Sequence, residues 1–306
     1  MPLDAFHAGR LAALDRFRLG TGPEPSPPVC PPVPAGMVTG EIDIVGPHGR
    51  IPLLTYRPAG PVTSALLWAH GGGFRHGSAS MPEGHWVSAE LAARAGAYVV
   101  SVDYRLAVGG VRYPVPLDDV HAAWEWLVSA ADLPEKRAIG GASAGAALAL
   151  ATALRTGVRP AEILLAYPFT HFPNPAADAG PAAELAAELP PVAHFTAAGI
   201  EDMVRNYVGR ISDLPPDALP GAARLAGLPP VRIVLSEYDY LRTSGELLAR
   251  QLGEAGVEVS VFLARGAPHG HLNQPADLPG TTGSLDFFAA ALADVKNGVD
   301  LDVETD

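Results

Sequence analysis

Cysteine is nearly absent from the sequence, which carries one thiol, Cys30, among 306 residues. A single cysteine cannot close a disulfide within the chain, and its proline-rich surroundings contain no metal-binding or redox motif. The cysteine content therefore indicates a protein of the reducing cytosol.

Positive charge is also scarce. Lys and Arg number 21 against 33 Asp and Glu, which gives a formal net charge of −12. Affinity for nucleic acid depends on clustered Lys and Arg that contact phosphates, and no such run occurs. We therefore expect no nucleic-acid partner.

Long hydrophobic runs are missing as well. The longest uncharged helical run, residues 142–154, is too short to span a bilayer. Charged residues such as Asp4 and Arg10 interrupt the first turns, so no signal-peptide core is visible. The sequence predicts a cytoplasmic protein without a membrane partner.

Apolar residues make up 48% of the chain and charged residues 18%, which is enough to bury a large core. From residue 65 onward, short apolar strands alternate with helical segments, as a mostly parallel sheet flanked by helices requires. We predict one catalytic α/β domain over residues 37–306. No internal repeat or second independent domain is visible.

Residues 1–36 precede this domain and divide into two parts. The apolar residues between Leu3 and Leu19 have near-helical spacing, which predicts an amphipathic helix packed on the main domain. Residues 23–34 contain too much proline for a helix or a paired strand to continue. We predict a cap helix followed by a proline-rich linker.

The main domain is expected to open with a hairpin over residues 38–56. A proline-punctuated insertion around residues 168–229 separates two core strands, and insertions of that size are usually functional. We predict a helical cap or lid there, with helices at 182–189 and 196–208. The further predicted strands are 65–69, 97–102, 137–140, 161–166, 231–235 and 257–263, and the further predicted helices are 85–95, 117–129, 144–154, 244–255 and 282–295.

The segment Gly141-Ala142-Ser143-Ala144-Gly145 follows a predicted strand and opens a predicted helix. In this G-x-S-x-G arrangement the turn exposes the serine, and the small neighbours allow strand, helix and substrate to approach closely. The pentapeptide alone is equally compatible with Ser143 as an ordinary helix N-cap. Its companions elsewhere in the chain favour a nucleophile.

A nucleophilic serine needs a histidine to take its proton and a carboxylate to orient that histidine. Asp239 follows one predicted strand and His269 follows the next, so both are expected at the carboxyl edge of the sheet. Glu237 and Asp277 compete for the acid role, and His271 competes for the base role. The chain order serine, acid, histidine disfavours Asp277, which follows both histidines, and Glu237 is interpreted as a contact outside the triad, so Ser143 and Asp239 are selected. His269 is favoured over His271 because it stands where the family motif described below has its histidine.

Backbone N–H donors for an oxyanion are expected in the loop after the first buried strand, because a loop without side chains can lie against a reacting carbonyl. We assign the oxyanion hole to the N–H groups of Gly71, Gly72 and Ala144. His70 precedes these glycines and is interpreted as an anchor of the loop rather than a base.

Taken together, these motifs resemble the hormone-sensitive lipase-like (HGGG) family of α/β-hydrolases, of the bacterial carboxylesterase type. The matching segments are His70-Gly71-Gly72-Gly73-Phe74, Ser101-Val102-Asp103-Tyr104-Arg105-Leu106-Ala107, Tyr113-Pro114, Gly141 to Gly145, Glu237-Tyr238-Asp239 and His269-Gly270. The resemblance implies hydrolysis of short- to medium-chain acyl esters through an acyl-enzyme intermediate, an N-terminal cap and no cofactor. It also implies a homodimer formed through the edge of the sheet.

Three departures from the family pattern leave the substrate open: Ala142 replaces an acidic residue, Val108-Gly109-Gly110 replaces Pro-Glu, and His271 adds an imidazole. The departures at Ala142 and His271 motivate an alternative in which the same triad acts on an amide, a thioester or an acetyl group, or performs a lyase or cyclase step in specialised metabolism. A non-catalytic small-molecule receptor is a third hypothesis. Candidate substrate-binding residues are Phe74, His271 and Phe169, and the histidines show no metal-ligand spacing.

Overall fold

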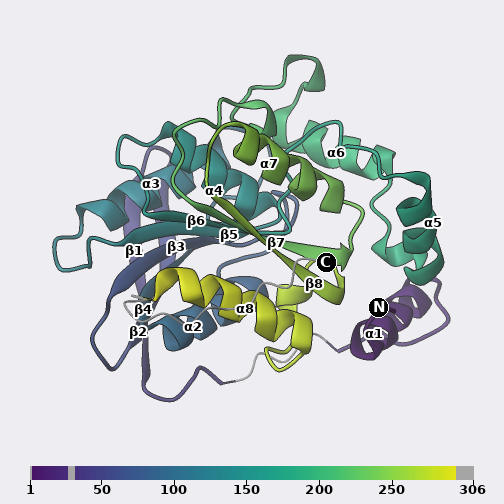
Figure 1. Ribbon diagram of the computed structural model, residues 1–306, viewed down its shortest axis with the longest axis horizontal. Coiled ribbons are helices and arrows are strands. Elements are labelled where there is room, and N and C mark those ends of the chain that lie inside the picture. The colour runs from purple at the N-terminus through teal and green to yellow at the C-terminus, as the bar shows by residue number, and fades with distance from the viewer. Residues whose placement is uncertain (1, 27–31, 294–306) are drawn as a thin grey trace.

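The computed structural model of the protein describes residues 2–26 and 32–293 (Figure 1). Cys30, part of the predicted proline-rich linker and the last residues of the predicted closing helix lie outside this range. Each strand and helix predicted above is present, with differences at the ends. The predicted α/β architecture is confirmed.

One eight-stranded sheet runs through the described chain in the order β1-β2-β4-β3-β5-β6-β7-β8. The first hairpin pairs antiparallel, β2 joins β4 antiparallel, and every later neighbouring pair is parallel. The strands are β1 (Met37–Gly46), β2 (Gly49–Pro58), β3 (Ser64–Ala69), β4 (Ala97–Val102), β5 (Arg137–Ala142), β6 (Glu162–Ala166), β7 (Val231–Tyr238) and β8 (Val259–Pro268).

Helices cover both faces of the sheet (Figure 1). One apolar cluster joins the sheet to α2 (Pro82–Ala95) and α8 (Pro279–Leu292). The larger cluster, on the opposite face, includes side chains of four further helices. They are α3 (Val115–Ser129), α4 (Ala144–Arg155), α6 (Ala197–Val208) and α7 (Arg242–Glu254). The central strands are continuously apolar because both of their faces are buried in this way.

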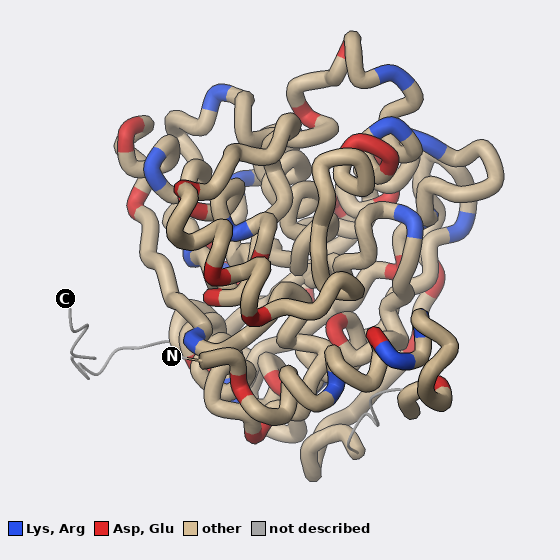
Figure 2. The backbone as a smooth tube through the Cα atoms, turned by 90° about the vertical axis from the view of Figure 1, so that its right-hand side faces the viewer, with Lys and Arg blue, Asp and Glu red and all other residues tan. Residues whose placement is uncertain are grey.

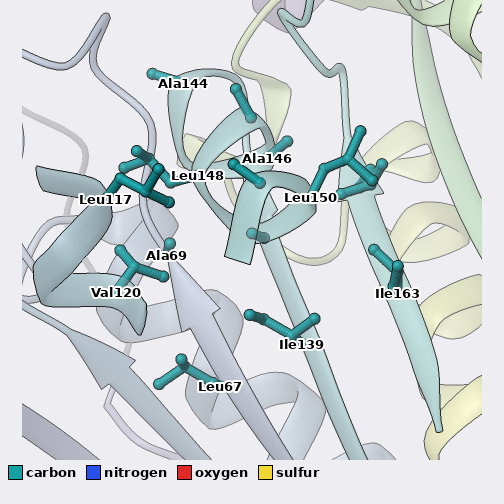
Figure 3. Packing of buried hydrophobic residues seen from close by; sticks show 14 of the residues in the cluster. Leu67, Ala69, Leu117, Val120, Ile139, Ala144, Ala146, Leu148, Leu150 and Ile163 are labelled. Carbon is teal, nitrogen blue, oxygen red and sulfur yellow. The ribbon is translucent and has the colours of Figure 1, made fainter. Parts of the chain in front are cut away.

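Helix α4, which begins directly after Ser143, is buried over its first nine residues. Figure 3 shows Leu148 and Leu150 packed among side chains of α3 and of the strands beneath, including Ile139 and Ile163. Burying each large aliphatic side chain contributes about 1.5–3 kcal/mol. This packing holds the N-terminus of α4, and with it Ser143, at the carboxyl end of β5.

The N-terminal helix and the insertion lie beside each other at one end of the molecule (Figure 1). Helix α1 (Ala5–Arg18) places Leu11 in a small apolar cluster with Leu185 of α5 (Ala179–Glu188). Helix α6 (Ala197–Val208) instead packs into the main cluster through Val204 and Tyr207. The two segments predicted to cap the domain are therefore in contact, through α1 and the short helical turn η1 (Pro191–Ala193) of the insertion.

Acidic and basic positions are interspersed along the described chain (Figure 2). Several form local pairs, such as Arg232 with Glu162 and Arg94 with Glu90. No helix in the described ranges combines the length and apolar character needed to cross a bilayer.

Candidate active site

Ser143 occupies the sharp turn between β5 and α4 with a left-handed φ of 53°. A Cβ on Gly145 would lie 2.2 Å from the carbonyl oxygen of Ala69, and one on Gly141 would lie 2.5 Å from the Gly145 backbone. Glycine at both positions is thus a steric requirement of the turn. Although Ser143 holds the N-cap position of α4, its side chain makes no capping bond.

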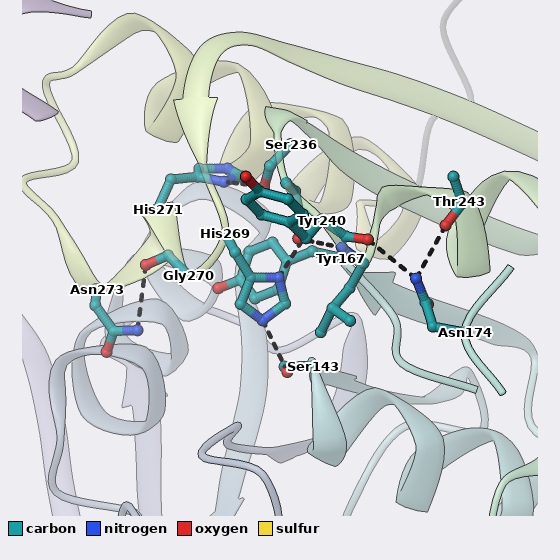
Figure 4. Close-up of polar contacts among 12 residues, drawn as sticks. Ser143, Tyr167, Asn174, Ser236, Tyr240, Thr243, His269, Gly270, His271 and Asn273 are labelled. Carbon is teal, nitrogen blue, oxygen red and sulfur yellow. Dashed lines mark hydrogen bonds and ion pairs between the residues drawn. The ribbon is translucent and has the colours of Figure 1, made fainter. Parts of the chain in front are cut away.

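The Ser143 hydroxyl instead lies 2.9 Å from Nε2 of His269 (Figure 4). The other ring nitrogen, Nδ1, lies 2.7 Å from Oδ2 of Asp239, whose Oδ1 accepts the N–H of Leu241 at 2.7 Å. Asp239 directly follows β7 and His269 directly follows β8. The carboxyl ends of three parallel strands therefore bring together the three side chains that sequence reasoning selected.

The ring of His269 is packed between two aromatic side chains. The centroids of Tyr167 and Phe195 lie 4.9 and 5.0 Å from that of the imidazole. Burial opposes ionisation, but the negative charge of Asp239 and its hydrogen bond outweigh burial and raise the pKa of His269. The charge of Glu83 acts in the same direction. The site thus favours an imidazolium at His269, as a general base requires after it takes a proton.

The rival histidine has different surroundings. His271 is fully buried, with Nδ1 2.9 Å from the Ser236 hydroxyl (Figure 4). Its Nε2 lies 2.8 Å from the Ser284 hydroxyl. Burial, reinforced by repulsion from His7 and His269, lowers the pKa of His271 to about 3. The structure therefore places it in a core hydrogen-bond network rather than in the substrate pocket.

The two phenylalanines considered for substrate binding are also core residues. Phe74 is fully buried and stacks on Tyr207 at 3.9 Å between ring centroids, while Phe169 is 1% exposed in the main cluster. Neither borders the pocket that contains Ser143. Sequence position close to a motif suggested contact with substrate, but packing against helix α6 and the sheet turns these rings inward.

The N–H groups that are available in the glycine loop after β3 differ from the expected oxyanion donors at one position. The N–H of Gly71 donates to Oε2 of Glu83 at 2.6 Å, so it is engaged within the protein. Gly72 and Gly73 border the pocket, and in the described structure their N–H groups have no protein acceptor. The available donors are therefore those of Gly72, Gly73 and the first residue of α4, Ala144.

The geometry of this loop depends on glycine. Gly72 has a φ of 111°, and a Cβ there would lie 2.0 Å from the carbonyl oxygen of His76. His70 stays beneath the loop, where its Nδ1–H donates to the Gly71 carbonyl at 2.7 Å and its ring stacks on Tyr104. His70 thus anchors the loop, and in the described structure it forms no hydrogen bond with Ser143 or His269.

A pocket of about 320 Å³ opens at Ser143. Its walls include Phe195, Met203 and Leu241, and its polar lining includes His269 and Glu83. A larger hollow of about 450 Å³ also borders Asp239, but neither Ser143 nor His269 lines it. The smaller pocket is the one that gives a ligand access to the serine.

Sequence reasoning noted Gly73 and Tyr167 only as parts of family segments and did not single out Glu83 or Asn273. Glu83 is 2% exposed and accepts hydrogen bonds from Tyr167 and Asn273 as well as Gly71. Glu83 lies two residues before the predicted helix at 85–95, where a glutamate resembles an ordinary charge near a helix N-terminus, so no local signal distinguished it. Among the described residues, no group of three or more His, Cys, Asp and Glu side chains is arranged to hold a metal ion.

Comparisons with known proteins agree with this architecture. A family model described as the alpha/beta hydrolase fold matches residues 66–273. Esterase LipI of Mycobacterium tuberculosis is 33% identical over 280 residues, which cover 84% of this chain and 82% of that protein. An esterase structure from Pyrobaculum calidifontis aligns with a TM-score of 0.72 and 32% identity, covering 83% of this chain and 84% of its own.

Brefeldin A esterase, described as a bacterial homologue of human hormone-sensitive lipase, aligns with a TM-score of 0.76 and 26% identity. The alignment covers 94% of this chain and 84% of that one. This chain belongs to the α/β-hydrolase family, and its resemblance to the hormone-sensitive lipase-like branch is confirmed.

Proposed function

We propose that this protein is a serine carboxylesterase that uses Ser143, His269 and Asp239 as its catalytic triad. The observation that carries the proposal is the continuous hydrogen-bonded series from the Ser143 hydroxyl through His269 to Asp239 beside a pocket. The esterase names of its relatives support the same class of enzyme.

Acylation follows from this geometry. As Oγ of Ser143 forms a bond to the ester carbonyl carbon, its proton passes to Nε2 of His269. The N–H groups of Gly72, Gly73 and Ala144 then stabilise the oxyanion of the tetrahedral intermediate. When the intermediate collapses, the bond to the alkoxy oxygen breaks and that oxygen takes the proton from His269. Water repeats the sequence on the acyl-enzyme and releases the acid.

Asp239 acts through the histidine. Its carboxylate accepts Nδ1–H, which fixes the tautomer that leaves Nε2 free to accept the serine proton, and it stabilises the resulting imidazolium. Burial of Asp239 strengthens this interaction because little water screens it.

The pocket favours short- to medium-chain acyl groups. Its volume of about 320 Å³ lies near the lower end of small-molecule sites, and Phe195, Met203 and Leu241 supply apolar contact. We propose that residues 1–36 and the insertion around 168–229 cap this pocket in a domain spanning 37–306. Phe195 and Met203 come from that insertion.

We further propose a cytoplasmic homodimer. Strand β8 lies at one edge of the sheet and leaves Val261 45% exposed, and an uncovered edge strand can pair with a second copy. Light scattering of the purified protein tests the oligomeric state, and Val261→Lys is expected to shift a dimer towards monomer.

Hydrolysis of p-nitrophenyl acetate and butyrate tests the catalytic proposal. We expect turnover by the wild type, its loss in Ser143→Ala, and labelling of Ser143 by a fluorophosphonate. Comparing one acyl group on oxygen, nitrogen and sulfur leaving groups tests the amide and thioester alternatives. A wild type that neither turns over short esters nor reacts with the fluorophosphonate would leave the receptor hypothesis in its place.

A further inference from the structure

A buried carboxylate that is not part of the triad lies at the same pocket. Glu83 belongs to the first turn of α2, is 2% exposed and lines the pocket together with Ser143. In the described structure it accepts three hydrogen bonds from neutral groups and forms no ion pair with Lys or Arg. Burying a carboxylate without a cation is costly, so a buried glutamate at this position indicates a specific role.

Both carboxylate oxygens act as acceptors. Oε2 accepts the Gly71 N–H at 2.6 Å, and Oε1 accepts the Tyr167 hydroxyl at 2.5 Å and the Asn273 side-chain amide at 3.0 Å. The orientation of Asn273 is determined, because its Oδ1 accepts the backbone N–H of Glu83. Burial is the largest effect on this carboxyl and raises the pKa of Glu83. The three accepted hydrogen bonds and the nearby His269 act in the opposite direction and stabilise the carboxylate.

These three partners come from three segments that build the site. Gly71 belongs to the oxyanion loop after β3, and Tyr167 directly follows β6. Asn273 follows the catalytic histidine and also donates to the carbonyl of Gly270 (Figure 4). One carboxylate thus joins the loop of the oxyanion donors to the loop of His269.

The bond to Gly71 bears directly on the oxyanion hole. It draws the Gly71 N–H towards the protein, while Gly72 and Gly73 keep their N–H groups unengaged at the pocket. A Cβ on Gly71 would lie 2.5 Å from Oε2 of Glu83 and 3.1 Å from Cβ of Ser143. The carboxylate, the loop and the nucleophile are therefore in close packing contact.

The charge of Glu83 also acts on His269. The pKa of this imidazole is raised mainly by Asp239, against the effect of burial, and Glu83 adds a second negative contribution. Ala142, the residue before the nucleophile, provides no carboxylate of its own, so Glu83 supplies this charge from another element.

We propose that Glu83 is a positioning residue of this site, which orients the oxyanion loop through Gly71 and holds a second negative charge near His269. The inference rests on the proposed esterase function. Glu83 contacts neither the nucleophile's hydroxyl nor the imidazole by a hydrogen bond, so its effect on the reaction passes through the groups it orients and through its charge.

The test compares Glu83→Gln and Glu83→Ala with Glu90→Gln, which makes the same change on the same helix at a residue paired with Arg94. Glutamine keeps the volume of the side chain but removes its charge. Its amide NH₂ group would face an N–H donor, of either Gly71 or Asn273, so one of the present hydrogen bonds would be lost. We expect kcat for p-nitrophenyl butyrate to fall about tenfold or more in Glu83→Gln, with KM within about twofold of the wild type. The acidic limb of kcat/KM should move to lower pH, because His269 loses a charge that favours its imidazolium.

Nuclear magnetic resonance titration of labelled histidines provides a second reading that needs no turnover, and thermal melting checks that each variant is folded. A fall in kcat together with a lower His269 pKa supports the proposal. A folded Glu83→Gln variant whose kcat and His269 pKa both equal those of the wild type overturns the proposal. A fall in kcat without a change in the His269 pKa also overturns it, because Glu83 then has a purely structural role. If the wild type hydrolyses no ester, yet the His269 pKa is lower in Glu83→Gln than in the wild type, the esterase function is refuted and the effect of Glu83 on His269 is not.

Discussion

Replacing Asp239 with asparagine is the sharpest perturbation of the proposed mechanism. The two side chains have nearly the same shape, so the change mainly removes one acceptor and a charge. Because Oδ1 accepts the Leu241 N–H, the asparagine oxygen is expected to stay on that side and its amide to face Nδ1 of His269. Nδ1 must then accept a hydrogen bond, which moves the imidazole proton to Nε2.

This tautomer cannot take the proton of Ser143, since Nε2 is the nitrogen that lies 2.9 Å from the serine hydroxyl. The equivalent change in a serine-protease triad lowers kcat about 10⁴-fold, which corresponds to about 5.5 kcal/mol. We expect Asp239→Asn to lose about 10³- to 10⁴-fold in kcat while KM changes little.

The assay is hydrolysis of p-nitrophenyl butyrate across pH, with melting temperature as the check on folding. Glu237→Gln and Asp277→Asn are matched controls, because sequence reasoning left both residues as rival acids. Glu237 accepts the N–H of Gly266 at 2.6 Å, whereas the carboxylate bonded to Nδ1 of His269 is that of Asp239. Retention of activity within about tenfold in folded Asp239→Asn would refute the reasoning, and so would an equal loss in either control.

Two further predictions concern pH and the nucleophile turn. Burial opposes protonation of His269, but the charge and hydrogen bond of Asp239 outweigh it and raise the pKa of His269. Because the base must be unprotonated to act, kcat/KM should increase with pH, and the pH of half-maximal kcat/KM should lie above the ordinary histidine pKa of 6.5. A half-maximal value below pH 6.5 would contradict the structure. Gly145→Ala would bring a Cβ within 2.2 Å of a backbone oxygen and should lower stability by about 1–3 kcal/mol and reduce activity. Gly157→Ala, which meets nothing within 4 Å, is the control in the same denaturation measurement.

Local patterns predicted most of the scaffold. Buried strands and amphipathic helices have periods that the sequence displays directly, and the G-x-S-x-G segment specifies a turn that only small residues permit. Strand ends were less accurate. Strand β7 continues to Tyr238 beyond its apolar run, because its pairing with β8 includes Ser236 and, after an irregularity, Tyr238. Chain order excluded Asp277 as the acid, and the family motif, not chain order, selected His269 over His271.

Side-chain surroundings were not predictable in this way. Phe74, Phe169 and His271 lie close to motifs in the sequence, yet packing places all three in the core. Gly71 looked equivalent to Gly72 until Glu83, twelve residues further on, proved to hold its N–H.

The sequence by itself determined the order of elements, the glycine-dependent turns and the residue types available at the carboxyl edge of the sheet, because these follow from local periodicity and backbone sterics. Only the tertiary structure decided which N–H groups face the pocket, which histidine is buried as a neutral ring, and that a carboxylate from α2 joins the site. Those outcomes depend on contacts such as the one between Glu83 and Asn273, 190 residues apart, which form only when the helices pack on the sheet.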